Sequence, residues 1–321
     1  MPEPLTLVFL GCGRITAKHA GILRKHPGAR CRFASRDGAK AAEFNRRFKG
    51  DGSYAGYETA LADAAVDVVV VATPPDSHLA LALDALAAGK HVIIEKPAFL
   101  HAADAGQVRD AAARAGRMVT VAENYRYRPL LRSLQRLLAE QVIGDLRLIQ
   151  IDAVKSQSAP AWLDATMPGA LWEGGIHWIH FIASLGPQIT GITGFRPGPH
   201  DTPERTMLAA ATFADGAVGT LAYSWEVPSP LKGLRMSHLY GTRGVIAFES
   251  NGLFVRCSGA RNRLHFPGFR DISGYGAMWR DFLAAFATGR EPDMTLELAR
   301  RDLALVEHCY RSAAQPATLE G

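Results

Sequence analysis

The 321-residue chain is poor in cysteine and contains no long apolar run. Its four cysteines, at positions 12, 31, 257 and 309, form no CxxC pair and lack the spacing of a zinc site, which argues against a disulfide framework or a zinc module. No apolar segment reaches the length of a membrane span, and the apolar residues 5–10 end at a glycine without the features of a signal peptide. We therefore expect a protein of the reduced cytoplasm without a membrane partner.

Charge of either sign is not in strong excess, because 36 basic and 31 acidic residues give a formal net charge of +5. The basic residues are scattered and are not interleaved with aromatic residues, so a nucleic-acid partner is not expected. A small positive excess suits an anionic small molecule better. The apolar content of 48% and the charged content of 21% are those of an ordinary globular protein, and the length allows two domains.

Residues 1–122 alternate short apolar runs with segments of helical periodicity. The run VDVVVVA at residues 66–72 is rich in β-branched residues, as in a parallel strand covered on both faces. Strands that alternate with helices through short links predict right-handed βαβ units and a doubly wound parallel sheet, the α/β Rossmann class. The predicted strands are residues 5–10, 31–34, 66–72, 91–95 and 118–122, and the predicted helices are residues 14–25, 39–48, 77–88 and 103–115.

Residues 123–321 have a different pattern, in which strands dominate and helices are fewer. Turns between strands are marked by the dipeptides Asp215–Gly216 and Asn251–Gly252. Runs of strands with segregated helices predict an α+β domain on a mostly antiparallel sheet. The predicted strands are residues 146–153, 208–213, 217–225, 236–241, 245–249 and 253–256, and the predicted helices are residues 129–139, 171–185, 278–287 and 296–312.

The sequence GCGRIT follows the first predicted strand and opens the first predicted helix. Gly11 permits a tight turn, and Gly13 lets the backbone approach a pyrophosphate at the helix N-terminus. The third glycine of the GxGxxG fingerprint is replaced by Thr16, so the motif alone is weak evidence and a ligand-free turn explains it nearly as well. Its position at the first βα junction of a parallel sheet favours a dinucleotide site.

The end of the second predicted strand bears on the phosphate state of this cofactor. A carboxylate there would bind the ribose 2′-hydroxyl of NAD, but the residues present are Ser35 and Arg36. A hydroxyl and a guanidinium suit the 2′-phosphate of NADP, which a carboxylate would repel. Asp37 is adjacent and able to reach a ribose, so the sequence favours NADP and leaves NAD open.

The stretch LWEGGIHWIH at residues 171–180 contains a second group of candidate residues. Glu173, His177 and His180 are spaced i, i+4 and i+7, so on a helix they would share one face. Such a face serves to hold a metal, to form an acid–base pair, or to fill the space beneath a sheet. The spacing differs from HExxH and zinc needs three converging ligands, so we expect no metal here.

Motifs along essentially the whole chain resemble those of the Gfo/Idh/MocA oxidoreductases, named for glucose–fructose oxidoreductase, inositol dehydrogenase and a rhizopine-catabolism protein. They include GCGRITAKHAGIL, ATPPDSHLALALDALAAGKHVIIEKP at residues 72–97, ENYRYRP at residues 123–129, VIGDLRLI at residues 142–149 and GTRGVIAFES at residues 241–250. The resemblance implies a Rossmann domain over residues 1–122. Residues 123–321 would form the substrate-binding and oligomerisation domain, with an open-faced sheet through which a homodimer or homotetramer forms.

The resemblance also assigns roles to individual residues. Lys96 of the EKP motif matches a lysine that lies near the nicotinamide and hydrogen-bonds the reacting oxygen, where an ammonium stabilises an alkoxide or polarises a carbonyl. Tyr125 matches the segment that enters the substrate domain and is expected to bind substrate. The residues expected to contact the cofactor are Gly11, Gly13, Arg14, Ile15, Ser35, Arg36, Thr73, Pro74, His78, Glu95, Lys96 and Asn124.

Sugar and polyol dehydrogenases of this family often carry D-x-x-x-H-x-x-D on a helix that lines the pocket. Aligned by spacing, Glu173 takes the first acidic place, His177 keeps the histidine, and His180 replaces the last aspartate. His177 is the candidate general acid–base, because imidazole titrates near neutral pH and oxidation of an alcohol releases a proton. Glu173 is expected to orient substrate hydroxyls or the imidazole, and His180 either lines the substrate site or packs beneath the sheet.

These expectations combine into an NADP-preferring oxidoreductase that transfers a hydride between nicotinamide and a sugar, keto-sugar or cyclic polyol. Lys96 would stabilise the substrate oxygen, while His177 and Glu173 serve proton transfer. One alternative is a lyase or glycoside-cleaving enzyme that keeps its nicotinamide tightly bound and returns the hydride, with His180 as an additional base. A second alternative is a catalytically silent nucleotide sensor, against which the retention of Lys96 and His177 argues.

Overall fold

The computed structural model describes residues 3–158, 168–198, 200, 202–229, 233–259 and 262–314. The chain forms two compact units, which are Met1–Glu123 with Tyr275–Arg300, and Asn124–Gly274 with Arg301–Gly321. The sequence predicted a single boundary after residue 122 and did not anticipate that residues 275–300 belong to the first unit. Among the described helices, none has both the length and the apolarity to cross a membrane.

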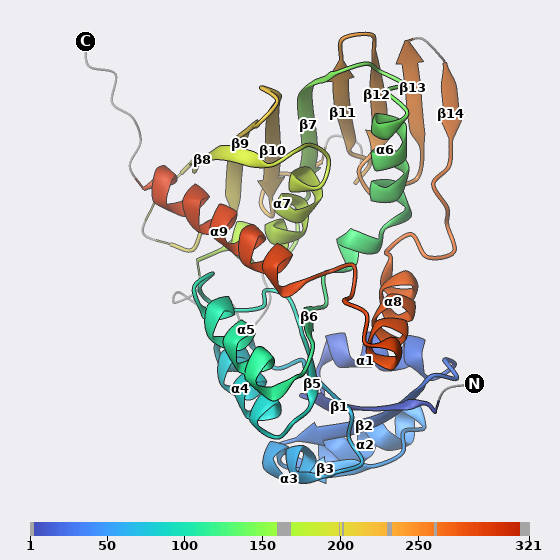
Figure 1. Ribbon diagram of the computed structural model, residues 1–321. Coiled ribbons are helices and arrows are strands. Elements are labelled where there is room, and N and C mark those ends of the chain that lie inside the picture. The colour runs from blue at the N-terminus through green and yellow to red at the C-terminus, as the bar shows by residue number, and fades with distance from the viewer. Residues whose placement is uncertain are drawn as a thin grey trace. The chain divides into compact units, whose positions relative to one another are not determined.

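The first unit is built on a six-stranded parallel sheet in the order β3-β2-β1-β4-β5-β6 (Figure 1), which confirms the Rossmann class. All four residues of Val68–Val71 are fully buried at its centre. The strand order reverses between β1 and β4, and ligands bind at such a switch point in doubly wound sheets. The strands are β1 (Leu5–Leu10), β2 (Ala29–Ser35), β3 (Ser53–Ala55), β4 (Val68–Val71), β5 (His91–Ile94) and β6 (Val119–Val121).

Helices connect these strands, and the first of them buries Ala20 and Leu23. The prediction missed β3 and the helix after it, because a three-residue strand with mostly exposed residues has no apolar run. The helices are α1 (Arg14–Leu23), α2 (Gly38–Phe48), α3 (Tyr57–Ala62), the 3-10 turn η1 (Pro75–Ser77), α4 (His78–Ala87), α5 (Asp104–Ala115) and α8 (Tyr275–Thr288).

Helix α8 joins the first unit through a buried aromatic side chain. Trp279 is fully buried, and its indole N–H donates to Nδ1 of His19 in α1 at 2.9 Å. The Trp279 ring also meets Phe9 of β1 edge-to-face, with ring centroids 6.2 Å apart. Because 260 positions separate Trp279 from His19, no local pattern in the sequence predicts this contact.

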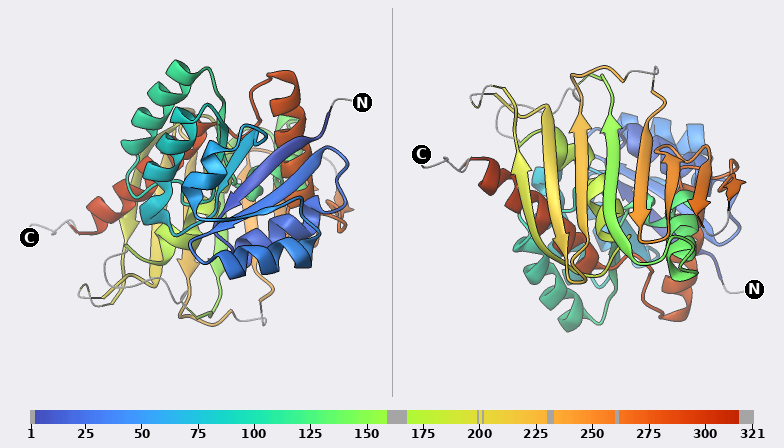
Figure 2. Two further views of the ribbon diagram at one scale, coloured as in Figure 1. Left: turned by 90° about the horizontal axis from the view of Figure 1, so that it is seen from below. Right: turned by 90° about the horizontal axis from the view of Figure 1, so that it is seen from above.

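The second unit is built on an eight-stranded sheet in the order β14-β13-β12-β11-β7-β10-β9-β8, whose strands lie side by side in Figure 2. The pair β7–β10 is parallel and the other neighbouring pairs are antiparallel, which confirms the α+β class. The strands are β7 (Leu146–Val154), β8 (Ile189–Phe195), β9 (Thr206–Phe213), β10 (Val218–Ser224), β11 (Met236–Gly241), β12 (Gly244–Glu249), β13 (Val255–Gly259) and β14 (Arg263–His265).

The residues of this sheet alternate between a buried and an exposed face. In β9, Met207 and Ala209 are buried, whereas Leu208 between them is 43% exposed. Ile182 packs over β10 at Gly219, where an added Cβ would lie only 2.8 Å from the isoleucine Cδ1. The helices are η2 (Asn124–Tyr127), α6 (Pro129–Ala139), the π-helical turn η3 (Leu171–Gly175), α7 (Ile176–Ala183) and α9 (Leu296–Ala313), of which α9 begins among the residues of the first unit.

Replacing Trp279 by phenylalanine should destabilise the first unit. The variant keeps an aromatic ring but leaves Nδ1 of the buried His19 without its donor, and a buried polar atom left unpaired costs about 1–3 kcal/mol. Urea unfolding followed by far-ultraviolet circular dichroism measures the free energy of unfolding. Leu264→Ala, on a side chain that is 61% exposed, is the control and should change it little; equal stability of Trp279→Phe and the wild type would show that the indole bond contributes nothing.

Candidate functional site

The glycine turn between β1 and α1 has the geometry of an anion site. Gly11 has a φ of +99°, and an added Cβ there would lie 2.7 Å from the carbonyl oxygen of Ala72, so only glycine fits. Gly13 opens on free space, with no atom of the described chain within 4 Å of an added Cβ. Gly13 directly precedes Arg14, the first residue of α1, and has no side chain that could cap the helix. The first backbone N–H groups of α1 are therefore available to a phosphate.

Thr16 replaces the third glycine of the fingerprint without disturbing this turn. Its side chain is fully buried, and its hydroxyl donates to the carbonyl oxygen of Gly11 at 2.7 Å. The hydroxyl therefore ties the first turn of α1 to the glycine that begins the loop. This bond accounts for a threonine where the common pattern has glycine.

The end of β2 places Ser35, Arg36 and Asp37 beside the glycine turn, because Gly11 donates its N–H to the carbonyl oxygen of Ala34 at 3.0 Å. Asp37 caps α2, since its carboxylate accepts the N–H groups of Ala39 and Lys40. Ser35 is buried, and its hydroxyl oxygen accepts the N–H of Asp37 at 3.1 Å. Arg36 is exposed. The carboxylate nearest to the predicted ribose position is thus engaged with a helix, while the guanidinium is accessible.

The loop after β4 is held by its own side chains. The hydroxyl of Ser77 lies 2.7 Å from Oγ1 of Thr73 and 2.8 Å from the carbonyl oxygen of Pro74. His78, the first residue of α4, is only 1% exposed, and its ring nitrogens face backbone carbonyl oxygens. Thr73 and Pro74 therefore lie at the surface of the loop, whereas His78 supports the loop from within.

Glu95 directly follows β5 and is a buried carboxylate with a partner for each oxygen. Its Oε1 lies 2.5 Å from Nε2 of His19, and its Oε2 accepts the backbone N–H of Lys96 at 3.0 Å. Because Nδ1 of His19 accepts the indole N–H of Trp279, the proton of the imidazole sits on Nε2 and is donated to Glu95. Burial alone would raise the pKa of Glu95, but the His19 bond and the charge of Lys96 outweigh it and lower the pKa.

Lys96 follows directly, at the carboxyl end of β5, where ligand sites of parallel sheets collect. The side chain is partly exposed, and the peptide bond to Pro97 is cis. The backbone on its N-terminal side is fixed by Glu95, and the carbonyl of Pro97 on its other side meets His78 at 3.0 Å. The lysine therefore stands on a backbone held from both sides.

In the second unit, the candidate acid–base residues lie on the π-helical turn η3 and the start of α7. Glu173 and His177 are both partly exposed. The His177 imidazole stacks on the ring of Tyr125, with centroids 4.5 Å apart and an interplanar angle of 9°. The structure thus brings together Tyr125 and His177, two residues that the sequence predicted to bind substrate, and places Glu173 on the turn directly before α7.

The two glycines of LWEGGIHW allow this turn to pass close to the sheet. An added Cβ at Gly174 would lie 2.2 Å from the hydroxyl oxygen of Tyr223 in β10, and one at Gly175 would lie 3.1 Å from Cδ1 of the same tyrosine. The Tyr223 hydroxyl in turn accepts the indole N–H of Trp225 at 2.8 Å. A larger residue at Gly174 would require either this turn or the Tyr223 side chain to shift.

Glu204 and Tyr310 hold the N-terminal end of η3, and the sequence did not predict either of them. Both carboxylate oxygens of Glu204, which is 2% exposed, lie 3.2 Å from the N–H of Leu171. Tyr310 donates its hydroxyl to Glu204 at 2.7 Å and accepts the N–H of Trp172 at 3.2 Å. Gly169 makes the close approach possible, since an added Cβ would lie 2.3 Å from the carboxylate. These two side chains satisfy helix N–H groups that no local residue caps.

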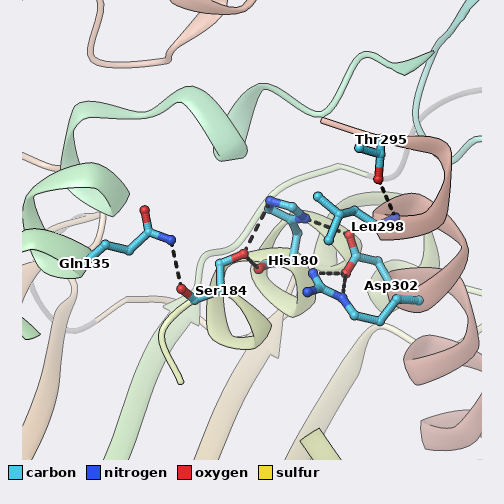
Figure 3. Close-up of polar contacts among 7 residues, drawn as sticks. Gln135, His180, Ser184, Thr295, Leu298 and Asp302 are labelled. Atoms are coloured by element: carbon cyan, nitrogen blue, oxygen red, sulfur yellow. Dashed lines mark hydrogen bonds and ion pairs between the residues drawn. The ribbon is translucent and has the colours of Figure 1, made fainter. Parts of the chain in front are cut away.

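His180 lies in a different environment from Glu173 and His177. It is fully buried, and its Nδ1 lies 2.7 Å from Oδ2 of Asp302 in α9 (Figure 3). The other oxygen of Asp302 accepts the guanidinium of Arg301, and Nε2 of His180 is 3.5 Å from the hydroxyl of Ser184. The expectation that His180 shares an accessible face with the other two, or touches substrate, does not fit this enclosure. Its bonds join α7 to α9.

Other chemistries find less support in the described residues. No group of three histidine, cysteine, aspartate or glutamate side chains converges there in a way that suits a metal ion. Burial raises the pKa of Cys12 to about 11 and that of Cys31 and Cys309 to about 12, so these thiols stay protonated and are poor nucleophiles.

Asn124, predicted to touch the cofactor, is buried and donates its amide to the carbonyl oxygen of Ser273 at 2.7 Å.

Two family models match the chain. Residues 5–123 match the model described as the oxidoreductase family with an NAD-binding Rossmann fold, and residues 131–247 match the GFO/IDH/MocA C-terminal domain.

Similar proteins include dehydrogenases. The trans-1,2-dihydrobenzene-1,2-diol dehydrogenase of Sus scrofa is 32% identical over 231 residues, which cover 70% of this chain and 65% of the pig enzyme. The crystal structure of GenD2 from gentamicin A biosynthesis in complex with NAD is 28% identical, with a TM-score of 0.85 and coverage of 98% of this chain and 95% of GenD2. Levoglucosan dehydrogenase in complex with NADH and levoglucosan shares the fold, with a TM-score of 0.86, 20% identity and 98% coverage of both chains.

The cap formed by Glu204 should give the second unit a recognisable pH dependence. Burial raises the pKa of Glu204 in the folded state, so its ionised form is the less stable one there. The free energy of unfolding should therefore fall as the pH rises from the ordinary carboxyl value of 4.5 through the raised value, and Glu204→Gln should remove this loss. Glu204→Ala should lower stability by about 1–3 kcal/mol for each buried donor left unpaired.

Urea unfolding at a series of pH values measures both effects. Glu140→Gln, on a side chain that is 49% exposed, is the matched control and should keep the wild-type pH profile. A Glu204→Gln variant with the same profile as the wild type would mean that the cap does not titrate as described.

Proposed function

The chain belongs to the Gfo/Idh/MocA family of NAD-binding oxidoreductases, and from this membership we propose that it transfers a hydride between a nicotinamide cofactor and a sugar, keto-sugar or cyclic polyol. The observation that carries the proposal is the end of β5, where the buried Glu95 fixes the backbone that presents Lys96. The pig relative supports the substrate class, because its name describes the oxidation of a cyclic compound with two neighbouring hydroxyl groups.

The residues of the first unit suit a dinucleotide. The open space at Gly13 and the uncapped first turn of α1 suit a pyrophosphate, and Gly11 lets the loop lie close to Ala72. Arg14 and Ile15 supply backbone N–H groups of that turn. The bound nicotinamide supplies or accepts the hydride. Thr73 and Pro74 at the surface of the loop after β4 complete the proposed cofactor contacts, and His78 supports the loop from within.

Lys96 and His177 divide the remaining chemistry. In oxidation, we assign to Lys96 the hydrogen bond that stabilises the substrate oxygen as its carbon loses a hydride, and to His177 the hydroxyl proton. In reduction, the ammonium polarises the carbonyl and the imidazolium returns the proton. Tyr125 supports the imidazole by stacking at 4.5 Å, and Glu173 orients a neighbouring hydroxyl of the substrate.

We propose NADP as the preferred cofactor and NAD as the second. Arg36 is exposed at the end of β2, and the neighbouring carboxylate of Asp37 is engaged with the N-terminus of α2. A guanidinium beside a hydroxyl matches a 2′-phosphate. GenD2, which is 28% identical, was crystallised with NAD, so the preference rests on Ser35 and Arg36 of this chain rather than on that relative.

No observation favours the alternative lyase or glycoside-cleaving activity. That mechanism calls for a further base, for which the sequence offered His180. The imidazole of His180 is fully buried and bonded to Asp302, so it is better assigned to the packing of α7 against α9. A catalytically silent nucleotide sensor does not require a precisely positioned lysine. The fixed backbone on both sides of Lys96 therefore favours an enzyme.

We propose that two or four copies associate through the open face of the eight-stranded sheet. Apolar side chains stand on its strands with substantial exposure, among them Leu208 at 43%, Val218 at 40% and Tyr240 at 37%. A row of exposed apolar residues on a sheet is typical of a surface that another chain covers. The resemblance to the Gfo/Idh/MocA family implied such a pairing.

A substrate panel tests the proposed activity. The protein is incubated with pooled sugars, keto-sugars and cyclic polyols and with oxidised and reduced NAD and NADP, while nicotinamide absorbance and substrate mass are followed in the same tube. We expect net cofactor turnover with a mass change of two hydrogens in one substrate. Lys96→Ala should lower kcat/KM by about 100- to 1000-fold, the effect of losing one oxyanion donor, whereas Lys25→Ala on an exposed lysine should not.

Substrate loss without net cofactor turnover would contradict the oxidoreductase and favour a returned hydride. Full activity of Lys96→Ala would contradict the role of that lysine.

The assignment of Arg36 predicts a selective loss of affinity. Arg36→Ala removes one charge-assisted contact, worth about 1.5–3 kcal/mol, so the Kd for NADPH should rise by about 10- to 100-fold. The Kd for NADH should change little. Quenching of protein fluorescence on titration with each nucleotide measures both constants; tighter binding of NADH than NADPH by the wild type would refute the assignment.

A further inference from the structure

Both ring nitrogens of His78 face carbonyl oxygens, and only the protonated imidazolium can donate a hydrogen bond from each nitrogen. Its Nδ1 lies 3.0 Å from the carbonyl oxygen of Pro97 and 3.1 Å from that of Ala98, and its Nε2 lies 2.9 Å from the carbonyl oxygen of Thr73. Carbonyl oxygens only accept hydrogen bonds, and a neutral imidazole carries a proton on one nitrogen. The neutral ring therefore directs a lone pair at a carbonyl oxygen, whereas the imidazolium donates to both sides.

The three carbonyls belong to the two loops that border the proposed cofactor site. Thr73 follows β4 and lies against the glycine turn, since an added Cβ at Gly11 would be 3.2 Å from the backbone nitrogen of Thr73. Pro97 and Ala98 directly follow Lys96. The charge on one buried ring thus decides whether the loop after β4 and the segment carrying the lysine are bonded to each other through it.

Opposing influences set the charge of His78. Burial lowers the pKa of the ring, while the bond to Thr73 and the charge of Glu95 at the end of β5 act against this effect. Glu95 is itself hydrogen-bonded to His19 and to the backbone N–H of Lys96. Asp76, in the turn η1 that precedes His78, is exposed to solvent. In the free protein the ring is consequently neutral at the pH where an ordinary histidine is half-protonated. Additional negative charge nearby would reverse this.

We propose that His78 takes up a proton when the dinucleotide binds, and that the imidazolium then ties the loop after β4 to the segment carrying Lys96. The proposal rests on the dinucleotide site proposed above, whose pyrophosphate would bring two negative charges to the glycine turn beside Thr73. His78 is in this sense a positioning residue, because it acts on the site through Thr73, Pro97 and Ala98.

Isothermal titration calorimetry detects the proton directly. NADH is titrated into the protein near pH 6.5, the ordinary value for histidine, in buffers of different ionisation enthalpy. NADH is the first probe because it lacks the 2′-phosphate of NADPH, which titrates near this pH itself. We expect uptake of a substantial fraction of one proton per bound NADH. The Kd should rise as the pH rises through the bound-state pKa, by up to about tenfold per pH unit for one linked proton.

Two variants separate His78 from other titrating groups. His78→Gln keeps one donor and one acceptor without titrating, so it should bind NADH with little proton uptake and a nearly flat pH dependence. His91→Gln is the matched control, because His91 is a partly buried histidine of the same unit that accepts the N–H of Met118, and it should keep the wild-type uptake. NADPH serves as the second probe, with the wild type compared against His78→Gln so that the titration of the phosphate cancels.

Nuclear magnetic resonance of the His78 ring gives a second readout that does not depend on a variant that folds. The pKa of His78 should rise when NADH is added. Binding of NADH without proton uptake, or an unchanged His78 titration, would overturn the role of His78 and leave the proposed oxidoreductase intact. Failure of both NADH and NADPH to bind at any pH would overturn the cofactor site and the proposal together.

Discussion

The buried carboxylate of Glu95 is the constraint on which the proposed chemistry depends. A carboxylate with 5% exposure is costly unless each oxygen has a partner, and the partners here come from α1 and from the next peptide bond. Trp279 of α8 selects the tautomer of His19 that donates to Glu95. Trp279, His19 and Glu95 thus form one chain of hydrogen bonds, which ties α8 to α1 within the first unit and fixes the backbone of Lys96.

In the second unit, buried polar groups at the N-terminus of a helix likewise need partners from distant residues. The glycines of the π-helical turn bring Glu173 and His177 close to the sheet, and the N–H groups at its start would be unsatisfied without Glu204 and Tyr310. His180 lies about one turn further along α7. Its hydrogen bond to Asp302 holds α7 against α9. Accessible residues for chemistry and buried residues for anchoring therefore alternate along a single short segment.

Much of the fold could be predicted from local pattern, whereas the anchors of the site could not. Apolar runs such as Val68–Val71 predicted the central strands, and the family motifs predicted Lys96. The edge strands β3 and β14 have three residues each and no buried run, so they were missed. Tyr310 and Glu204 are 106 positions apart, and Asp302 and His180 are 122 apart. Such pairs are specified by tertiary packing, and neither partner stands in a periodic pattern that reveals the other.

A single-turnover experiment with NADPH deuterated at the transferable C4 position tests most directly whether this site moves a hydride. Protein in excess over nucleotide is mixed with the keto form of the substrate found in the panel, and the reduced product and the recovered nucleotide are analysed by mass spectrometry. We predict deuterium on the carbon that carries the new hydroxyl group, and unlabelled NADP in the recovered nucleotide. Product formed without deuterium, while the label stays on the nicotinamide, would contradict hydride transfer as the function of this protein.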